Sequence, residues 1–326
     1  MNISLRRNTI KGTIVLLVLM SAHPAFSQTD LENALNSVPK TREKVMATFK
    51  STKLINLHTN ETIHKNELDF KVDHRFGDIA GDNGGVRQFF GLDNSTDIRI
   101  GFDYGVTDRL TAGLARAKGA TVVQQLYELS LKYRLIEQTT DDQVPVSITL
   151  FGSNTIAAVK ANRDDPTSAI SYQNFSDRMN YVSQLIIARK FNSNFSVTLV
   201  PTYIHRNYTA FRDQNELFAI GAGGRLKVSK WMSLVVDYVL PFRNEEQQEY
   251  LEGVNLSKFY NPLGVGLEME TGGHVFHLNF TNATAIQEMQ FIPDTKSSWS
   301  KGQYRWGFSI SRRFSFNKDK EKSKEN

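Results

Sequence analysis

Residues that could carry out catalysis or bind a metal ion are scarce in this sequence. The chain has 326 residues with seven histidines and no cysteine, which excludes disulfides, thiolate metal sites and cysteine nucleophiles. His274 and His277 fall on opposite faces of a strand, so they do not form a strand chelate. No Gly-x-Ser-x-Gly elbow is present. We therefore predict no catalytic residue, no metal site and no cofactor.

Charged side chains recur instead at every second position of apolar stretches. The clearest stretch covers residues 68–76, where apolar side chains alternate with Asp, Lys, Asp and Arg. A β-strand places two such sets on opposite faces. If the apolar face meets lipid, the charged face lines a lumen, and the predicted lumen-lining residues are Asp69, Lys71, Asp73, Arg75, Arg99, Asp103, Lys132, Arg134, Asp237, Glu268, His277 and Arg305. Side chains of both signs could line an aqueous path, or they could close it as an ion-pair network.

The same alternation continues along the rest of the chain and predicts about twelve strands. The clearest cover residues 68–76, 98–104, 129–135, 234–240, 263–269 and 304–310. Weaker patterns cover residues 110–116, 144–153, 181–189, 195–203, 218–228 and 274–280. Many of these stretches approach the ten residues that a tilted strand needs to cross the hydrocarbon layer.

The connections between these strands are mostly sorted by length. Short turns are expected at residues 106–109, 191–194, 228–231 and 271–273, and long polar loops at 77–95, 154–177, 206–215, 242–261 and 282–302. Alternating short turns and long loops are typical of outer-membrane barrels, whereas a soluble sandwich has no reason to sort its loops by side. We predict an all-β fold, a closed antiparallel transmembrane β-barrel of about 12 strands.

The two ends of the sequence have a different character from the barrel. Positive residues precede a short apolar run and small residues, as in a secretory signal peptide that is cleaved before Gln28. The predicted organisation is a signal peptide (1–27), a partly helical periplasmic lead-in (28–60), the barrel (61–316) and a charged, disordered tail (317–326). The final strand ends at Phe316 and resembles the signal that the barrel-assembly machinery reads.

Composition limits the partners of the protein. The chain carries 39 basic and 34 acidic residues, a formal net charge of +5, and three of the basic residues belong to the predicted signal peptide. The mature chain is therefore nearly neutral, which gives no support for a nucleic-acid partner. The partners expected are outer-membrane lipid, the barrel-assembly machinery and a small polar solute, and the oligomeric state is open.

Several short motifs resemble those of a known family. They are His74-Arg75-Phe76-Gly77, Phe89-Phe90-Gly91-Leu92-Asp93 and Tyr104-Gly105 running into Thr107-Asp108-Arg109-Leu110. Together they resemble a family of exported Bacteroidota barrel proteins that is known only as a domain of unknown function. The resemblance covers most of the chain after about residue 50. It implies an outer-membrane β-barrel and supplies no catalytic residue.

Two main functions, and a third that is less favoured, are compatible with these features. The favoured hypothesis is porin-like passage of a small polar solute through a narrow charged lumen. The alternative is a plugged, non-conducting barrel that acts as a binding or structural partner in the envelope, with Phe89 and Phe90 of an outer loop as its contact. An outer-membrane lipid hydrolase is the less likely third hypothesis, so the protein is not expected to be an enzyme.

Overall fold

The computed structural model describes residues 43–316. The predicted signal peptide, residues 28–42 of the predicted lead-in and the predicted tail (317–326) lie outside these described residues. No helix within residues 43–316 is long and apolar enough to cross a membrane.

Twelve antiparallel strands form one closed barrel, in which β1 pairs with both β2 and β12. The prediction of a closed barrel of about twelve strands is therefore confirmed. The strands are β1 (Glu67–Asp78), β2 (Ser95–Gly105), β3 (Leu110–Lys118), β4 (Gln125–Ile136), β5 (Ser147–Ala157), β6 (Met179–Lys190), β7 (Phe195–Arg206), β8 (Glu216–Lys227), β9 (Met232–Phe242), β10 (Leu263–Thr271), β11 (His274–Thr281) and β12 (Arg305–Ser315). Closure leaves no unpaired strand edge, which a barrel in lipid requires.

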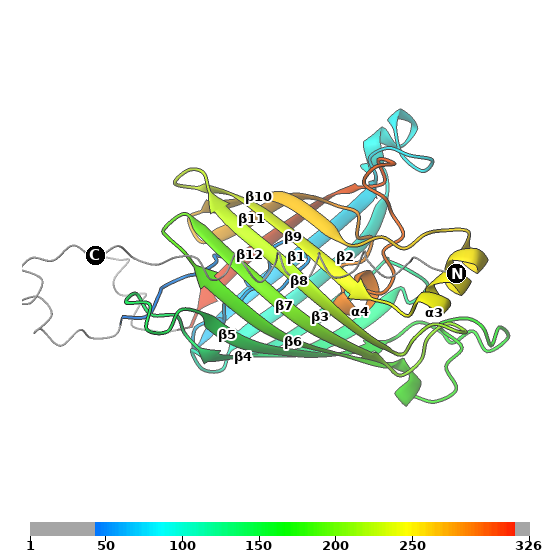
Figure 1. Cartoon of the computed structure of the whole chain (residues 1–326), viewed down its shortest axis with the longest axis horizontal. Coiled ribbons are helices and arrows are strands. Elements are labelled where there is room, and N and C mark those ends of the chain that lie inside the picture. Colours follow the sequence, from blue (N-terminus) through cyan, green and yellow to red (C-terminus); the bar gives the residue numbers. More distant parts are fainter. Residues whose placement is uncertain (1–42, 317–326) are drawn as a thin grey trace, which may run out of the picture. The chain divides into compact units, whose positions relative to one another are not determined.

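Figure 1 shows the tilted strands, with the loops that carry η1 (Val86–Gly91) and α3 (Glu245–Asn255) at one end of the barrel. Within residues 43–316 the two other short helices are η2 (Ser176–Arg178) and α4 (Glu288–Phe291). The Asn244 side chain accepts a hydrogen bond from the Gln247 N–H and so caps α3. We call the end that carries η1 and α3 the loop end, and the opposite end the turn end.

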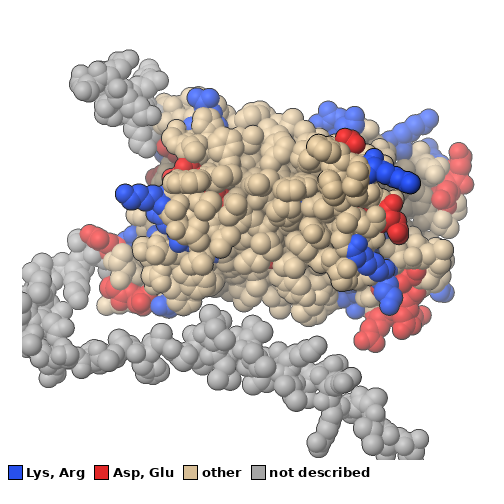
Figure 2. Space-filling model, turned by 90° about the horizontal axis from the view of Figure 1, so that it is seen from above, with Lys and Arg blue, Asp and Glu red and all other residues tan. Residues whose placement is uncertain are grey.

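The outer surface of the barrel is apolar around its middle. Figure 2 shows Lys, Arg, Asp and Glu gathered at the two ends of one face, with a band of other residues between them. Large apolar side chains that are 40% to 57% exposed face outward on several strands, and include Ile100, Phe102, Leu114, Leu129, Leu131, Leu150, Ile220, Leu234 and Val236. This is the outward apolar band of a transmembrane barrel.

Candidate functional site: the filled barrel interior

Two segments fold into the barrel and fill it. Residues 48–63, which we call the N-terminal plug, are buried except for Lys50 and the half-buried Glu61. Residues 282–298, which we call the loop plug, are also mostly buried and contain α4. The sequence predicts a partly helical periplasmic lead-in over residues 28–60, whereas residues 48–60 lie inside the barrel and contain no helix.

The N-terminal plug is a narrow hairpin. The N–H of Leu54 donates to the carbonyl of Leu57 over 2.8 Å, and the N–H of Thr59 donates to the carbonyl of Thr52 over 3.0 Å. At the tip, three consecutive backbone N–H groups have no partner within the hairpin and point to the barrel wall. The hairpin therefore needs an acceptor on the wall.

Asp237 on β9 supplies that acceptor. Its Oδ2 atom accepts hydrogen bonds from the N–H groups of Ile55, Asn56 and Leu57 over 2.9, 2.6 and 3.1 Å. Its Oδ1 atom accepts from Nδ2 of Asn56 over 2.7 Å. Four donors thus converge on one buried carboxylate, an arrangement that fixes the hairpin tip and satisfies the charge.

Three cations on the barrel wall also form hydrogen bonds to the hairpin. Nζ of Lys71 lies 3.2 Å from Oγ of Ser51 and 3.1 Å from Oγ1 of Thr52. Nζ of Lys132 donates to the carbonyls of Thr52 and Thr59 over 3.0 and 3.2 Å. The third cation, Arg75, donates to Oδ1 of Asn56 over 2.6 Å and to carbonyls of the loop plug.

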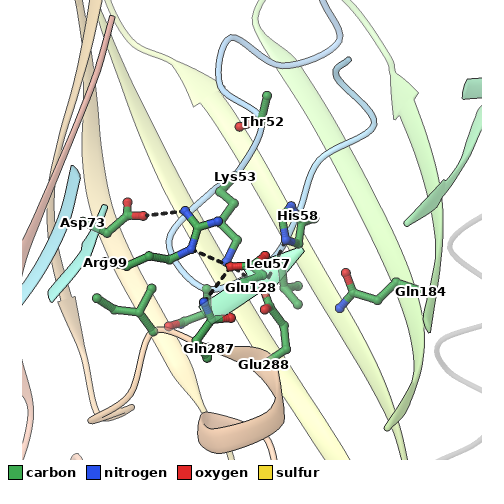
Figure 3. A network of polar contacts seen from close by, with 12 residues as sticks. Thr52, Lys53, Leu57, His58, Asp73, Arg99, Glu128, Gln184, Gln287 and Glu288 are labelled. Carbon is green, nitrogen blue, oxygen red and sulfur yellow. Dashed lines mark hydrogen bonds and ion pairs between the residues drawn. The ribbon is translucent and has the colours of Figure 1, made fainter. Parts of the chain in front are cut away.

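A buried polar cluster joins the two plugs to each other (Figure 3). Nζ of Lys53 lies 2.7 Å, and Nε2 of His58 3.3 Å, from Oε1 of Glu288. Burial alone would raise the pKa of Glu288, but the ammonium of Lys53 outweighs it and holds that pKa well below its usual range. Burial lowers the pKa of His58 well below its ordinary value, and Lys53 and Lys132 lower it further. His58 is therefore neutral and Glu288 ionised near neutral pH.

Other charges pair within the wall. Nε of Arg99 donates to Oε2 of Glu128 over 2.9 Å, and Nη1 of the same arginine lies 3.5 Å from Asp73. The Gln287 side chain of the loop plug also donates to Glu128, over 2.6 Å (Figure 3). The charges of these wall residues are therefore compensated without any contact to the N-terminal plug.

A second wall-to-wall group lies on β8, β10 and β11. Glu268 accepts from Nε of Arg225 over 2.6 Å and lies 3.2 Å from Nε2 of His277. Both predicted members of this group, Glu268 and His277, are buried.

The wall formed by β5 to β9 carries large apolar side chains on its inner face, between buried Ser, Thr, Asn and Gln side chains. The large apolar side chains are Phe151, Val182, Ile186, Val200, Ile204, Leu217, Val235 and Val239. Most of them share one hydrophobic cluster with Leu57 of the N-terminal plug and with Phe291 and Ile292 of the loop plug. The His58 ring also stacks on Phe151 with centroids 3.9 Å apart.

Glycines on β8 make room for the hairpin. A Cβ atom at Gly221 would lie 2.6 Å from Cδ2 of Leu57, and one at Gly223 would lie 2.5 Å from Cδ1 of Leu54. Side chains at these positions would therefore collide with the hairpin. By contrast, Gly224 has nothing closer than 3.7 Å at its Cβ position.

The twelve residues predicted to line a lumen all occupy the inward phase of their strands. Ten of them are buried, and Asp103 and Arg134 are half-buried. Arg134 lies 3.1 Å from Glu137 and 3.6 Å from Glu61, and Arg305 pairs with Asp78. Their role in solute passage stays a prediction.

Sequence reasoning missed the plug residues. Lys53, His58, Gln287 and Glu288 belong to segments without strand periodicity, and Glu128 was passed over on β4 although it has the inward phase. The signal that could have found the plugs is composition, because residues 48–62 are dense in Ser, Thr and Asn.

Phe89 and Phe90, predicted as outer-loop contacts, lie in η1 at the loop end and are 61% and 48% exposed. Both have positive φ, 45° and 53°, which is a strained conformation for a side chain of this size.

Two cavities flank the plugs. The outer cavity, at the loop end, has a volume of about 760 Å³ and is bounded by three long loops, α3 and the loop plug. The inner cavity, at the turn end, has a volume of about 540 Å³ and lies beside the N-terminal plug. The two share no lining residue.

Within residues 43–316, no group of three or more His, Asp or Glu side chains could hold a metal ion.

These features define the class of the protein, a closed membrane β-barrel with a filled interior. A family model described as a membrane-bound β-barrel domain (DUF5777) matches residues 49–314. The chain therefore belongs to this family. No curated protein matches the chain.

Solved structures match the chain at low sequence identity and with TM-scores below 0.5. An outer-membrane channel from Pseudomonas putida F1 is 13% identical with a TM-score of 0.47, covering 78% of this chain and 98% of that one. The NanC porin is 9% identical with a TM-score of 0.45, covering 76% and 100%. The KdgM porin in complex with disordered oligogalacturonate is 9% identical with a TM-score of 0.43, covering 77% and 99%.

Proposed function

We propose that this protein is a porin-like outer-membrane channel for a small polar solute, closed in the conformation described here by the N-terminal plug. One observation carries the proposal: Lys71, Lys132 and Asp237 on the wall make their hydrogen bonds to the hairpin and not to one another. When the hairpin leaves, these charges are hydrated and line a polar path. A barrel whose interior is permanently filled would be at least as stable with apolar side chains at these three positions.

The proposal includes a location and an orientation. The apolar band contacts outer-membrane lipid, the turn end faces the periplasm and the loop end faces the outside. Export by the cleaved signal peptide and insertion by the barrel-assembly machinery are parts of the same proposal, as is an origin in the Bacteroidota. No enzymatic activity is part of it.

The test uses two matched glycine substitutions on β8. Gly221→Val places a side chain where Leu57 now packs, so it expels the hairpin, whereas a Cβ at Gly224 meets only ordinary van der Waals contacts at 3.7 and 3.9 Å. Each full-length mature protein is folded, checked by the mobility difference between boiled and unboiled samples, and inserted into a planar bilayer. A third protein lacks residues 43–63 and keeps the loop plug. It serves as the reference without the N-terminal plug, and we call it the plug-free barrel.

We expect the parent and Gly224→Val to be silent for most of the recording, and Gly221→Val and the plug-free barrel to give discrete conductance steps. A plug-free barrel that inserts and stays silent would refute the channel proposal.

A second candidate function is a permanently plugged barrel that contacts an envelope partner through η1. Two adjacent, exposed phenylalanines in a strained backbone support it. A photo-crosslinking residue at Phe89 would form a defined adduct in intact cells that the same residue at the exposed Phe175 does not form. Equal labelling at both positions would reject this contact.

A further inference from the structure

We propose that the outer cavity is a binding site for a short, uncharged saccharide. Its volume of about 760 Å³ lies within the range of ordinary small-molecule sites. The floor is formed by Met289 and Gln290 of the loop plug, and the sides are formed by α3 and the loops that follow β5 and β7. The cavity therefore opens on the side of the long loops, where a solute from outside would first arrive.

Aromatic side chains of the cavity provide the stacking surfaces. Tyr172 and Tyr208 meet edge to face with centroids 5.7 Å apart, and Phe211 and Tyr250 meet similarly at 6.2 Å. The fifth ring is that of Phe259. A pyranose ring carries apolar C–H faces between its hydroxyl groups, and those faces pack well on flat aromatic rings.

Arginines hold these rings in fixed positions. The guanidinium carbon of Arg178 lies 4.8 Å from the Tyr172 centroid, and Arg178 also donates to the carbonyls of β5 and the loop after it. The guanidinium of Arg243 lies 4.0 Å from the Phe259 centroid. Rings fixed in this way lose little conformational freedom when a ligand binds.

The two cations that line the cavity, Arg206 and Lys296, are each paired with an anion. Nη2 of Arg206 lies 2.9 Å from Asp213, and Nζ of Lys296 lies 2.8 Å from Asp294. The carboxylate of Asp165 accepts from its own loop at Thr167. Because both lining cations already have an anion, and Arg178 and Arg243 direct their N–H groups to backbone carbonyls, the site favours an uncharged solute over an ionic one.

Hydrogen-bonding groups remain available in the cavity. Nε of Arg206 is buried without a partner. Gln290 uses its amide N–H groups on the β3–β4 loop, and within residues 43–316 no donor reaches its carbonyl oxygen. The hydroxyls of Tyr172, Tyr208 and Tyr250 likewise have no hydrogen bond from that part of the chain. Five such groups around aromatic faces match the alternating hydroxyls and C–H faces of a sugar.

Binding is tested on the folded, full-length mature protein in detergent, so the result does not depend on conduction. The probes are maltotriose, cellotriose and xylotriose, with trigalacturonate as the acidic counterpart and naphthalene as the purely aromatic one. Binding is followed by saturation-transfer NMR and by intrinsic fluorescence. The variants are Tyr208→Ala and Tyr250→Ala, and the matched control is Phe175→Ala, an exposed aromatic of the same loop region that does not line the cavity.

We expect saturable binding of at least one neutral trisaccharide, weakened about tenfold by either tyrosine substitution and unchanged by Phe175→Ala. No saturable binding of any neutral trisaccharide would overturn the proposal, and so would an equal loss in the Phe175→Ala control. Preference for trigalacturonate or for naphthalene would overturn the assignment of the ligand class. A silent bilayer with intact saccharide binding would refute the channel while leaving this site in place.

Discussion

The two halves of the inner wall hold the plugs by different means. On β1, β2, β4 and β10 to β12 the inner face is charged, and its side chains bind named polar atoms over 2.6 to 3.2 Å. On β5 to β9 the inner face combines uncharged polar side chains with large apolar ones, which pack against Leu57 and the loop plug. Its buried charged side chains are Arg206, Arg225 and Asp237. We call these the charged half and the apolar half.

The two halves therefore have different roles: one fixes the position of the hairpin, and the other supplies apolar contact area. Hydrogen bonds to charged groups are directional and fail when the partner moves by an ångström or two. Apolar contact is non-directional and scales with buried area. The charged half and Asp237 therefore fix where the hairpin sits, while the apolar half supplies surface that any apolar segment of similar volume could cover.

The largest effect is expected from removing the carboxylate on which the hairpin tip depends. Asp237→Ala leaves three backbone N–H groups and the Asn56 amide without their acceptor, which weakens seating of the hairpin by about 3–5 kcal/mol. Trypsin should then cleave after Lys50 and Lys53 in the folded barrel much faster than in the parent. Asp237→Asn retains an acceptor oxygen and should lie between the two. Equal cleavage of parent and Asp237→Ala would show that this carboxylate does not position the hairpin.

A somewhat smaller effect is expected on the apolar half. Leu57→Ala leaves a cavity against β8 and should weaken seating by about 3 kcal/mol, within the range for buried leucines. The same cleavage assay measures it. Leu129→Ala, on the lipid-facing surface, is the matched control and should change cleavage little. If both leucine variants behave like the parent, adhesion by the apolar half is disproved.

Acidification tests the cluster that joins the plugs. The pKa of His58 is lowered in the folded protein, so below about pH 6.5 the unfolded or released hairpin binds a proton that the seated one does not. Stability of the seated hairpin therefore falls as the pH falls, by up to about 1.4 kcal/mol per pH unit. The depressed pKa of Glu288 keeps that carboxylate ionised, so it does not contribute in this window.

We expect the open probability in a bilayer to be higher at pH 5 than at pH 7.5. His58→Asn should reduce this dependence, and His64→Asn, which alters an exposed histidine near the turn end, should preserve it. A parent channel with the same open probability at both values would contradict the pH argument.

The smallest effect concerns ion preference once the hairpin is gone. In the plug-free barrel, neutralising Arg99 and Arg134 to glutamine removes two inward cations and should shift preference towards cations. Arg116→Gln is the control, since its guanidinium faces outward over the Tyr127 ring. An unchanged reversal potential in a conducting preparation would mean that these arginines do not face the path.

Periodicity predicted the strands and their phase, and strand length together with the sorting of the loops predicted the barrel. A lipid-facing strand must alternate every second residue, and a one-residue slip would turn Asp69 and Lys71 towards lipid, so that pattern is recorded in the sequence itself. The alternation of short turns and long loops predicted that the long loops lie together at one end of the barrel. The same reasoning could not assign residues 48–63, because a hairpin that follows the shape of a cavity has no period of its own.

The sequence by itself determined that this chain forms a closed β-barrel with charges pointing inward. Its alternating stretches are strands, and strands that face lipid can pair all their backbone N–H and C=O groups only in a closed barrel. Only the tertiary structure decided what those charges meet. The carboxylate of Asp237 and the backbone of Asn56 are separated by most of the chain, and they come together because closure of the barrel brings β9 over the entering hairpin. Whether an inward charge faces water or a plug is a property of the closed barrel, and no local pattern encodes it.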